Sequence, residues 1–292
     1  MARIRASDVV FTGAAALTVA PGAAIAPARW SATAARLSRM DRLCGLALVA
    51  CDAALIDAAL AATAPEWNGE RTAIVFGTAY GCHATNEDYY RGVARDGALG
   101  ASPRLFAYTL PSSPVGEISI HYGVRGPTTV LANGLVSGVD ALAEGVAIVA
   151  EGRADRALVC AADVATPLLS SILGGAPLVD AAAAIVVERT ADASSRGATP
   201  RGRLVGAAAA FAADGARGAA LRDAIARALA DADVAEPALR KKLDGSDVPG
   251  ALGAAPLVAL ARWLAAGEHD ALALVSAGDD GGAGSAAVVV AS

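Results

Sequence analysis

The chain has 292 residues and a mass of 28.8 kDa, with a formal net charge of −5 and a pI near 5.2. Hydrophobic residues make up 55% and charged residues 18%, which excludes a disordered chain and allows one large or two ordinary domains. The acidic balance argues against a nucleic-acid partner. No apolar stretch of 18 residues is free of Gly, Pro or charge, so we expect no membrane span.

The N-terminal apolar stretch is predicted to be a β-strand, Val9–Val19, rather than a signal peptide. Asp8 stands at its start, and Gly13, Pro21 and Gly22 interrupt it. The spacing of the four cysteines fits neither a zinc site nor a disulfide framework, so we expect reduced thiols in a cytoplasmic protein. These cysteines are Cys44, Cys51, Cys82 and Cys160.

The next part of the chain alternates between helical and strand-like segments. Helical spacing extends over Ala32–Ala62. Short, almost continuous apolar runs are typical of strands buried on both faces. These runs are Thr72–Gly77, Thr128–Ala132, Arg156–Ala162 and Ala183–Val187.

A helix is predicted over Ser137–Gly152, because Val139, Leu142, Val146 and Val149 form one apolar stripe. Ser137 is interpreted as its N-cap, with Asp140 completing a capping box. Helices alternating with buried strands indicate an α/β fold whose strands are largely parallel.

The final part of the chain follows a segment rich in Ser, Gly, Pro and Arg, Ala191–Arg203. This segment divides the chain into a first part, 1–190, a connection, 191–203, and a last part, 204–292. The expected elements of the last part are a strand at Leu204–Phe211, helices at Ala219–Ala230 and Leu257–Leu264, and strands at Ala271–Val275 and Ser285–Val290. The Gly-rich run Gly278–Gly284 is interpreted as a hairpin turn, since it holds neither a Walker lysine nor a dinucleotide motif.

The candidate catalytic loop is Ala132–Gly138, where a buried strand leads into a helix and free N–H groups become available. The spacing between its glycine and serine does not fit a serine-hydrolase elbow, so Ser137 is interpreted as a cap rather than a nucleophile. Cys82 and His83 are adjacent in sequence, which directs their side chains apart. We find no metal or phosphate motif and expect no cofactor.

Several stretches resemble the β-ketoacyl synthases of the thiolase-like fold. They are RMDRLCGLALVACD (39–52), VFGTAYG (75–81), FAYTLPSSPVGEISIHYGVRGP (106–127) and GPTTVLANGLVSGVDAL (126–142). Together with Arg156–Glu188 they cover most of residues 1–190, in the family's order. Within that family the chain looks like a chain-length factor, the non-condensing subunit of type II polyketide synthases.

The resemblance implies an α/β fold with α-β-α-β-α layers, here with a shortened C-terminal half. In condensing members a cysteine stands nine residues after the glycine of Gly126-Pro127, and here that position is Leu135. Where a catalytic Gly-His is expected, the chain has Gly250-Ala251-Leu252-Gly253, and Asp280-Gly281-Gly282 stands in place of the Gly-Phe-Gly-Gly gate. The short C-terminal half is similar to partner subunits of aryl-polyene and highly reducing systems.

The resemblance also implies a heterodimer with a cysteine-bearing ketosynthase, which contacts the acyl carrier protein. Arg36, Arg39 and Arg42 form the local cation cluster that this chain could offer to an acidic carrier. Interface residues would be Thr128, Thr129, Val130, Leu131, Ala132, Asn133 and Leu135. Tunnel residues would be Tyr108, Thr109, Leu110, Pro111, Ser112 and Ser113, with the bulk of Tyr108 and Leu110 setting product length; core packing is the alternative reading of these two.

Two other functions stay open at this point. The chain could be an acyl-transfer enzyme that uses Cys82 or Ser137. It could also be a thiolase-like acyl-binding scaffold without a partner. Acylation of the purified chain would indicate the first, and stable monomeric behaviour the second.

Overall fold

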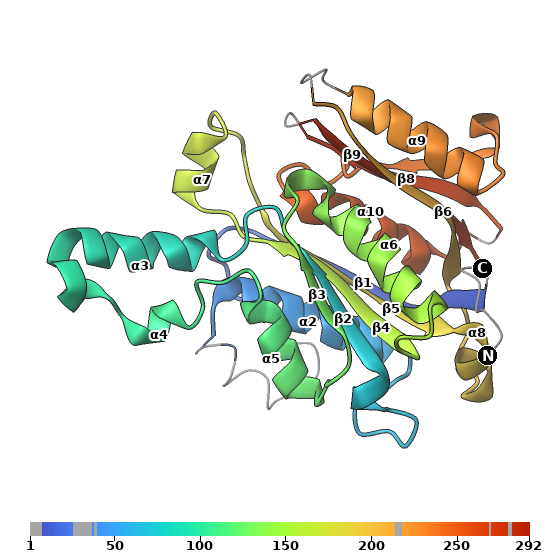
Figure 1. Cartoon of the computed structure of the whole chain (residues 1–292), viewed down its shortest axis with the longest axis horizontal. Coiled ribbons are helices and arrows are strands. Elements are labelled where there is room, and N and C mark those ends of the chain that lie inside the picture. Colours follow the sequence, from blue (N-terminus) through green and yellow to red (C-terminus); the bar gives the residue numbers. More distant parts are fainter. Residues whose placement is uncertain (1–7, 26–36, 38–39, 214–217, 269, 280–281) are drawn as a thin grey trace.

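A computed structural model describes residues 8–25, 37, 40–213, 218–268, 270–279 and 282–292. In these residues nine strands form one sheet of order β3-β2-β4-β5-β1-β6-β9-β8-β7 (Figure 1). The strands are β1 (Val9–Val19), β2 (Thr72–Gly77), β3 (Thr128–Leu131), β4 (Arg156–Asp163), β5 (Asp180–Arg189), β6 (Gly202–Phe211), β7 (Lys241–Leu243), β8 (Leu272–Gly278) and β9 (Ala283–Ala291).

The sheet is nearly divided between β1 and β6, where Phe11 opposite Gly202 is the one paired position. Its two parts face each other across a central layer of helices, and further helices cover the outer faces (Figure 1). The α-helices are α2 (Arg42–Asp57), α3 (His83–Asp96), α4 (Pro103–Phe106), α5 (Ser113–Tyr122), α6 (Ser137–Ala150), α7 (Pro167–Ile172), α8 (Thr190–Ser195), α9 (Ala219–Asp231) and α10 (Ala255–Ala266). Short 3₁₀ turns include η4 (Gly134–Val136) and η6 (Leu252–Ala254).

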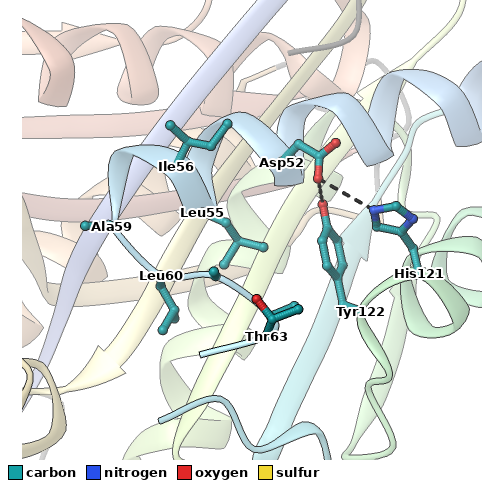
Figure 2. A pocket seen from close by; sticks show the side chains of 10 residues that line it. Asp52, Leu55, Ile56, Ala59, Leu60, Thr63, His121 and Tyr122 are labelled. Atoms are coloured by element: carbon teal, nitrogen blue, oxygen red, sulfur yellow. Dashed lines mark hydrogen bonds and ion pairs between the residues drawn. The ribbon is translucent and has the colours of Figure 1, made fainter. Parts of the chain in front are cut away.

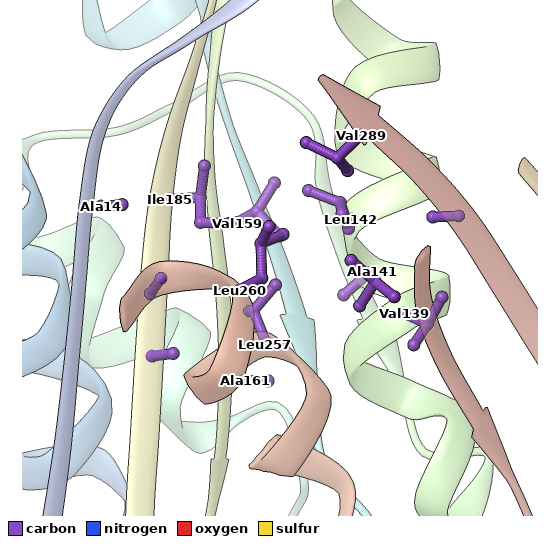
Figure 3. Close-up of a cluster of buried hydrophobic side chains, with 14 of the residues drawn as sticks. Ala14, Val139, Ala141, Leu142, Val159, Ala161, Ile185, Leu257, Leu260 and Val289 are labelled. Carbon is purple, nitrogen blue, oxygen red and sulfur yellow. The ribbon is translucent and has the colours of Figure 1, made fainter. Parts of the chain in front are cut away.

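Three hydrophobic clusters hold the layers together. The largest lies between the two parts of the sheet and is built around α6 and α10, with Leu142 and Leu257 fully buried (Figure 3). A second joins α2 and α5 to the outer face of the β1–β5 part, and a third joins α9 to the β6–β9 part. The expected order of layers, α-β-α-β-α, is therefore confirmed.

The expectation of largely parallel strands is wrong in part. β2 pairs in parallel with β3 and β4, but β5 runs antiparallel to β4 and to β1, and β9 runs antiparallel to β6 and β8. Every one of β4's residues is buried, because helices cover both faces of the sheet there. Burial produces the continuous apolar runs whatever the direction of the strand, so the pattern could not distinguish the two arrangements.

Other segments differ from their expected bounds. Of the predicted helix Ala32–Ala62, residues 32–36 and 38–39 lie outside the described residues, and α2 covers Arg42–Asp57. The Asp41 carboxylate caps the first turn of α2 by accepting from the N–H of Leu43 at 2.8 Å. The segment Ala191–Arg203 contains most of α8 and the start of β6.

Candidate functional site

The loop after β3 has a defined geometry that leads directly into α6. Gly134 takes a φ of +70°, η4 follows, and α6 begins at Ser137. The Ser137 hydroxyl donates to the Gly134 carbonyl at 2.7 Å and accepts from the Asn133 N–H at 2.8 Å. The predicted capping box is therefore wrong. The serine ties the loop together from inside the helix, while Asp140 accepts from Asn133 Nδ2 and from the Ser285 hydroxyl.

Leu135 lies half-buried in η4, at the carboxyl end of the parallel strands β2, β3 and β4. The segment 250–253 is brought to the same corner, because η6 packs against η4. The contact is close: a methyl group on Gly253 would lie 3.0 Å from the Gly134 carbonyl and 3.1 Å from the Ala79 nitrogen. Position 135 thus offers hydrocarbon, and the segment beside it carries no imidazole.

Asp163, which the sequence analysis missed, holds the neighbouring turn of this corner. Its carboxylate is 0% exposed and accepts from the Thr78 hydroxyl at 2.9 Å, the Ala79 N–H at 2.9 Å and the Tyr80 N–H at 3.3 Å. Burial raises the pKa of Asp163 from 3.8 to about 6, and these three hydrogen bonds oppose that shift. The feature of the sequence that could have indicated Asp163 is its place directly after the apolar run Arg156–Ala162.

The predicted tunnel segment, residues 108–113, connects α4 to α5 and lies against the turn before α3. Leu110 is 62% exposed, so the alternative that it packs in this chain's core is wrong. Its carbonyl accepts from the Cys82 thiol at 3.3 Å. Tyr108 is half-buried and donates from its hydroxyl to Glu117 at 2.8 Å. Thr109 donates to the Phe106 carbonyl at 2.9 Å.

The predicted interface strand is an edge strand. β3 pairs only with β2 among the described residues, and it ends at Leu131 rather than Ala132. Thr128, Ala132 and Asn133 are exposed, and the residues between them on β3 are half-buried. β3 therefore presents unpaired backbone groups of the kind that monomeric proteins usually cover.

Several exposed apolar side chains lie on helices that stand out from the sheet. They lie on α3, α4, α7 and the segments after them, which project on one side of the molecule (Figure 1). Leu99 is 97% exposed. The others are Tyr90, Phe106, Leu110, Leu168 and Ile172. Exposed apolar side chains on one side of a molecule are one feature of protein interfaces.

The alternative nucleophiles are enclosed. Cys82 is 2% exposed and Ser137 is 0% exposed, and within the described residues neither is hydrogen-bonded to a histidine. The pKa of the Cys44 thiol is raised, mainly by a hydrogen bond with Cys82 and secondly by burial. Burial also lowers the pKa of His83. All four cysteines are buried free thiols, and inertness is typical of such groups.

The predicted cation cluster is only partly described. Arg36 and Arg39 lie outside the described residues, as do His269, Asp280 and Gly281. Arg42 forms an ion pair at 2.5 Å with the fully buried Asp180 and donates to the Ala23 carbonyl. Its charge therefore serves the fold of this chain.

In the described part of the chain, no group of three His, Cys, Asp or Glu side chains is placed to hold a metal ion. None of the helices described has the length and hydrophobicity needed to cross a membrane.

Comparisons with known proteins identify relatives by sequence. At 36% identity over 131 residues, the chain is similar to the tetracenomycin polyketide synthase ketoacyl synthase alpha subunit of Streptomyces glaucescens, covering 43% of this chain and 30% of that protein. Nodulation protein E of Rhizobium leguminosarum bv. trifolii is 31% identical over 138 residues, covering 47% and 33%. The matched region thus spans about a third of these curated relatives.

Solved structures extend the likeness in fold to the whole chain. The ishigamide ketosynthase/chain length factor superposes with a TM-score of 0.80 at 23% identity, covering 97% of this chain and 99% of that one. A β-ketoacyl synthase from Burkholderia phymatum gives 0.81 at 15% identity, covering 98% and 99%. Residues 6–197 match the family described as "Beta-ketoacyl synthase, N-terminal domain". With this match over most of its length and a thiolase-like fold throughout, the chain belongs to the β-ketoacyl synthase family.

Proposed function

We propose that the chain is a chain-length factor: a subunit that does not condense, pairs with a cysteine-bearing ketosynthase and bounds the acyl tunnel of a type II polyketide or polyene system. The observation that carries this proposal is Leu135 at the corner where the family places its nucleophile. A leucine can neither attack a thioester nor polarise a malonyl carbonyl. The neighbouring segment 250–253 offers no histidine that could supply proton transfer.

The exposed surface supports a partner. We propose that a second, similarly folded subunit covers the unpaired edge of β3 and the exposed apolar side chains on α3, α4 and α7. Among the similar structures, one is named as a ketosynthase/chain length factor and another as a ketosynthase with an acyl-carrier protein. We extend this arrangement to the present chain, with the partner supplying the reaction centre and the carrier binding to the complex.

Residues 108–113 are proposed to limit the tunnel. Leu110 is solvent-exposed in the single chain, while its backbone is held by the Cys82 thiol. A side chain that is exposed in the subunit and fixed at its backbone is suited to project into a cavity completed by a partner. Added bulk there would shorten the space for the growing acyl chain.

Coexpression with a cysteine-bearing ketosynthase tests the proposal. We expect a 1:1 complex that makes product, while the isolated chain makes none. Leu110→Trp should shift the product distribution to shorter chains without loss of the complex. Phe211→Trp introduces the same ring at an exposed position of β6, outside 108–113 and outside the surface proposed for the partner, and should leave the distribution unchanged.

Three outcomes would contradict the proposal. The isolated chain could catalyse condensation, or it could remain a stable monomer that takes no ketosynthase partner. Incubation with acyl thioesters could also give stoichiometric acylation that disappears in Cys82→Ala, which would favour an acyl-transfer enzyme.

A further inference from the structure

The turn between β2 and α3, residues 78–82, is fixed by a short series of hydrogen bonds. Its first part is held by Asp163, which accepts from the Thr78 hydroxyl and from the next two backbone N–H groups. The Thr78 hydroxyl also accepts from the Gly81 N–H at 3.0 Å. Because these bonds set the path of the backbone, the turn forms a firm support for the segment that packs on it.

Residues 108–113 lie against this support through two contacts. The Cys82 thiol, which is 2% exposed, donates to the Leu110 carbonyl at 3.3 Å. Gly81 lies directly against Pro111, since a methyl group on Gly81 would be 3.1 Å from Pro111 Cγ and 3.3 Å from its Cβ. The depth at which the segment lies is therefore set by Gly81 and Cys82.

The Leu110 carbonyl also connects the support to α5. It accepts from the Ser113 N–H at 3.0 Å, and this turn leads the chain into α5. The far end of α5 is held against α2, where the Tyr122 hydroxyl donates to Asp52 (Figure 2). The 110–113 turn is thus tied to the core on the α5 side, and the Cys82 thiol ties it on the other side.

The Cys82 thiol has a fixed position of its own. Cys82 is the residue before α3, and its side chain hydrogen-bonds with the Cys44 thiol on α2. One turn further along α3, the Thr85 hydroxyl donates to Asp41, the N-cap of α2. The start of α3 is therefore anchored on the start of α2, and the thiol cannot follow a movement of Leu110.

We propose that Cys82 is a positioning residue for chain-length selection: its thiol holds the 110–113 turn at one depth, so that the Leu110 side chain stops the acyl chain at one length. This inference rests on the role proposed above for residues 108–113. Close packing resists an extra methylene only where the wall does not yield. The bulk of Leu110 then sets the mean product length, while the bond from Cys82 sets how sharply that length is selected.

The distribution of product lengths made by the complex with a coexpressed ketosynthase tests this inference. Cys82→Ala removes the donor and should raise the share of products longer than the natural one by roughly threefold, as expected for one weak hydrogen bond. Cys82→Ser keeps a donor and should restore the natural distribution. Cys160→Ala is the matched control, because it removes a fully buried thiol that donates to Ala47 on α2 instead, and it should change nothing.

Gly81→Ala perturbs the same support in the opposite direction. The added methyl group would press on Pro111 and move the turn away from residues 78–82, so the products should become shorter. Gly152→Ala controls for backbone strain. Gly152 has a φ of +72°, similar to the +58° of Gly81, but open space around it among the described residues, and we expect no change in product length.

Hydrogen exchange of the same complexes gives a readout that does not depend on product. The Ser113 amide, which is bonded to the Leu110 carbonyl, should exchange roughly threefold faster in Cys82→Ala, because the turn opens more often. In Cys82→Ser and Cys160→Ala it should exchange at the natural rate.

The outcomes separate this inference from the proposed function. If Leu110→Trp shifts product length but Cys82→Ala changes neither the distribution nor the exchange of Ser113, the inference is overturned and the proposed function stands. Failure of Cys82→Ser to restore the natural distribution, or equal broadening by Cys160→Ala, would overturn it too. If Leu110→Trp itself has no effect, residues 108–113 do not limit the tunnel, and the inference fails together with that part of the proposed function.

Discussion

The substitution Asp163→Asn gives a direct test of the charge buried beside the corner formed by η4 and η6. Asp163 is fully buried, and burial raises its pKa from 3.8 to about 6. The folded protein therefore holds the proton more tightly than the unfolded chain does between these two values. As the pH rises through this window the unfolded state gains relative stability, by roughly 3 kcal/mol in total. Below the window the carboxyl is neutral in both states, and above it the full cost of the buried charge is present.

Urea denaturation at several pH values between 3.5 and 7.5 measures the effect as the difference between natural chain and variant. Asparagine keeps an oxygen for the Thr78, Ala79 and Tyr80 donors but never ionises. From pH 4 to pH 7 we expect the free energy of unfolding of the variant to rise by roughly 2.4 kcal/mol relative to the natural chain, since part of the total effect lies below pH 4. This corresponds to a shift of about 4 °C in Tm. Asp88→Asn, at an exposed carboxylate, should show almost none of this change. A stability difference that stays constant across the range would refute the reasoning.

Three further outcomes are expected. Gly138→Ala would place a methyl group 2.5 Å from a backbone carbonyl of η6 and should cost about 1–3 kcal/mol in urea unfolding, whereas Gly116→Ala in α5 has open space and should be neutral or stabilising. The four buried thiols should react with a disulfide reagent only at the rate of unfolding; fast labelling of the folded chain would contradict their burial. Val130→Pro on β3 should abolish copurification with the ketosynthase, while Lys241→Pro on the opposite sheet edge, β7, should leave the complex intact.

Much of the fold could be predicted because burial leaves a simple trace in the sequence. The runs around β2, β4 and β5 are apolar on both faces, and their strands appear within a few residues of the expected bounds. Strand direction leaves no such trace. The helix α8 was missed because its short polar sequence is also typical of a loop.

Parts of the candidate site that lie in one stretch of the sequence could be predicted. Contacts between residues from different elements could not. The loop at Leu135 follows a strand and precedes a helix, so its place could be expected. The role of Ser137 could not, since a hydroxyl at that position can bond either to the helix or back to the loop. The Asp52–Tyr122 contact joins residues 70 positions apart, and only the packing of α2 against α5 brings them together.

The central layer of helices has an evolutionary consequence. Helices enclosed by sheet on both sides approach the strands closely at some positions, and the many small residues of this chain, among them 77 alanines, suit such contacts. On Gly145, for example, a methyl group would lie 2.2 Å from Val159. Position 135, in contrast, is half-buried. On the role proposed for Leu135, a catalytic side chain at this position would be lost without repacking the interior, while selection on the tightly filled interior would preserve the fold.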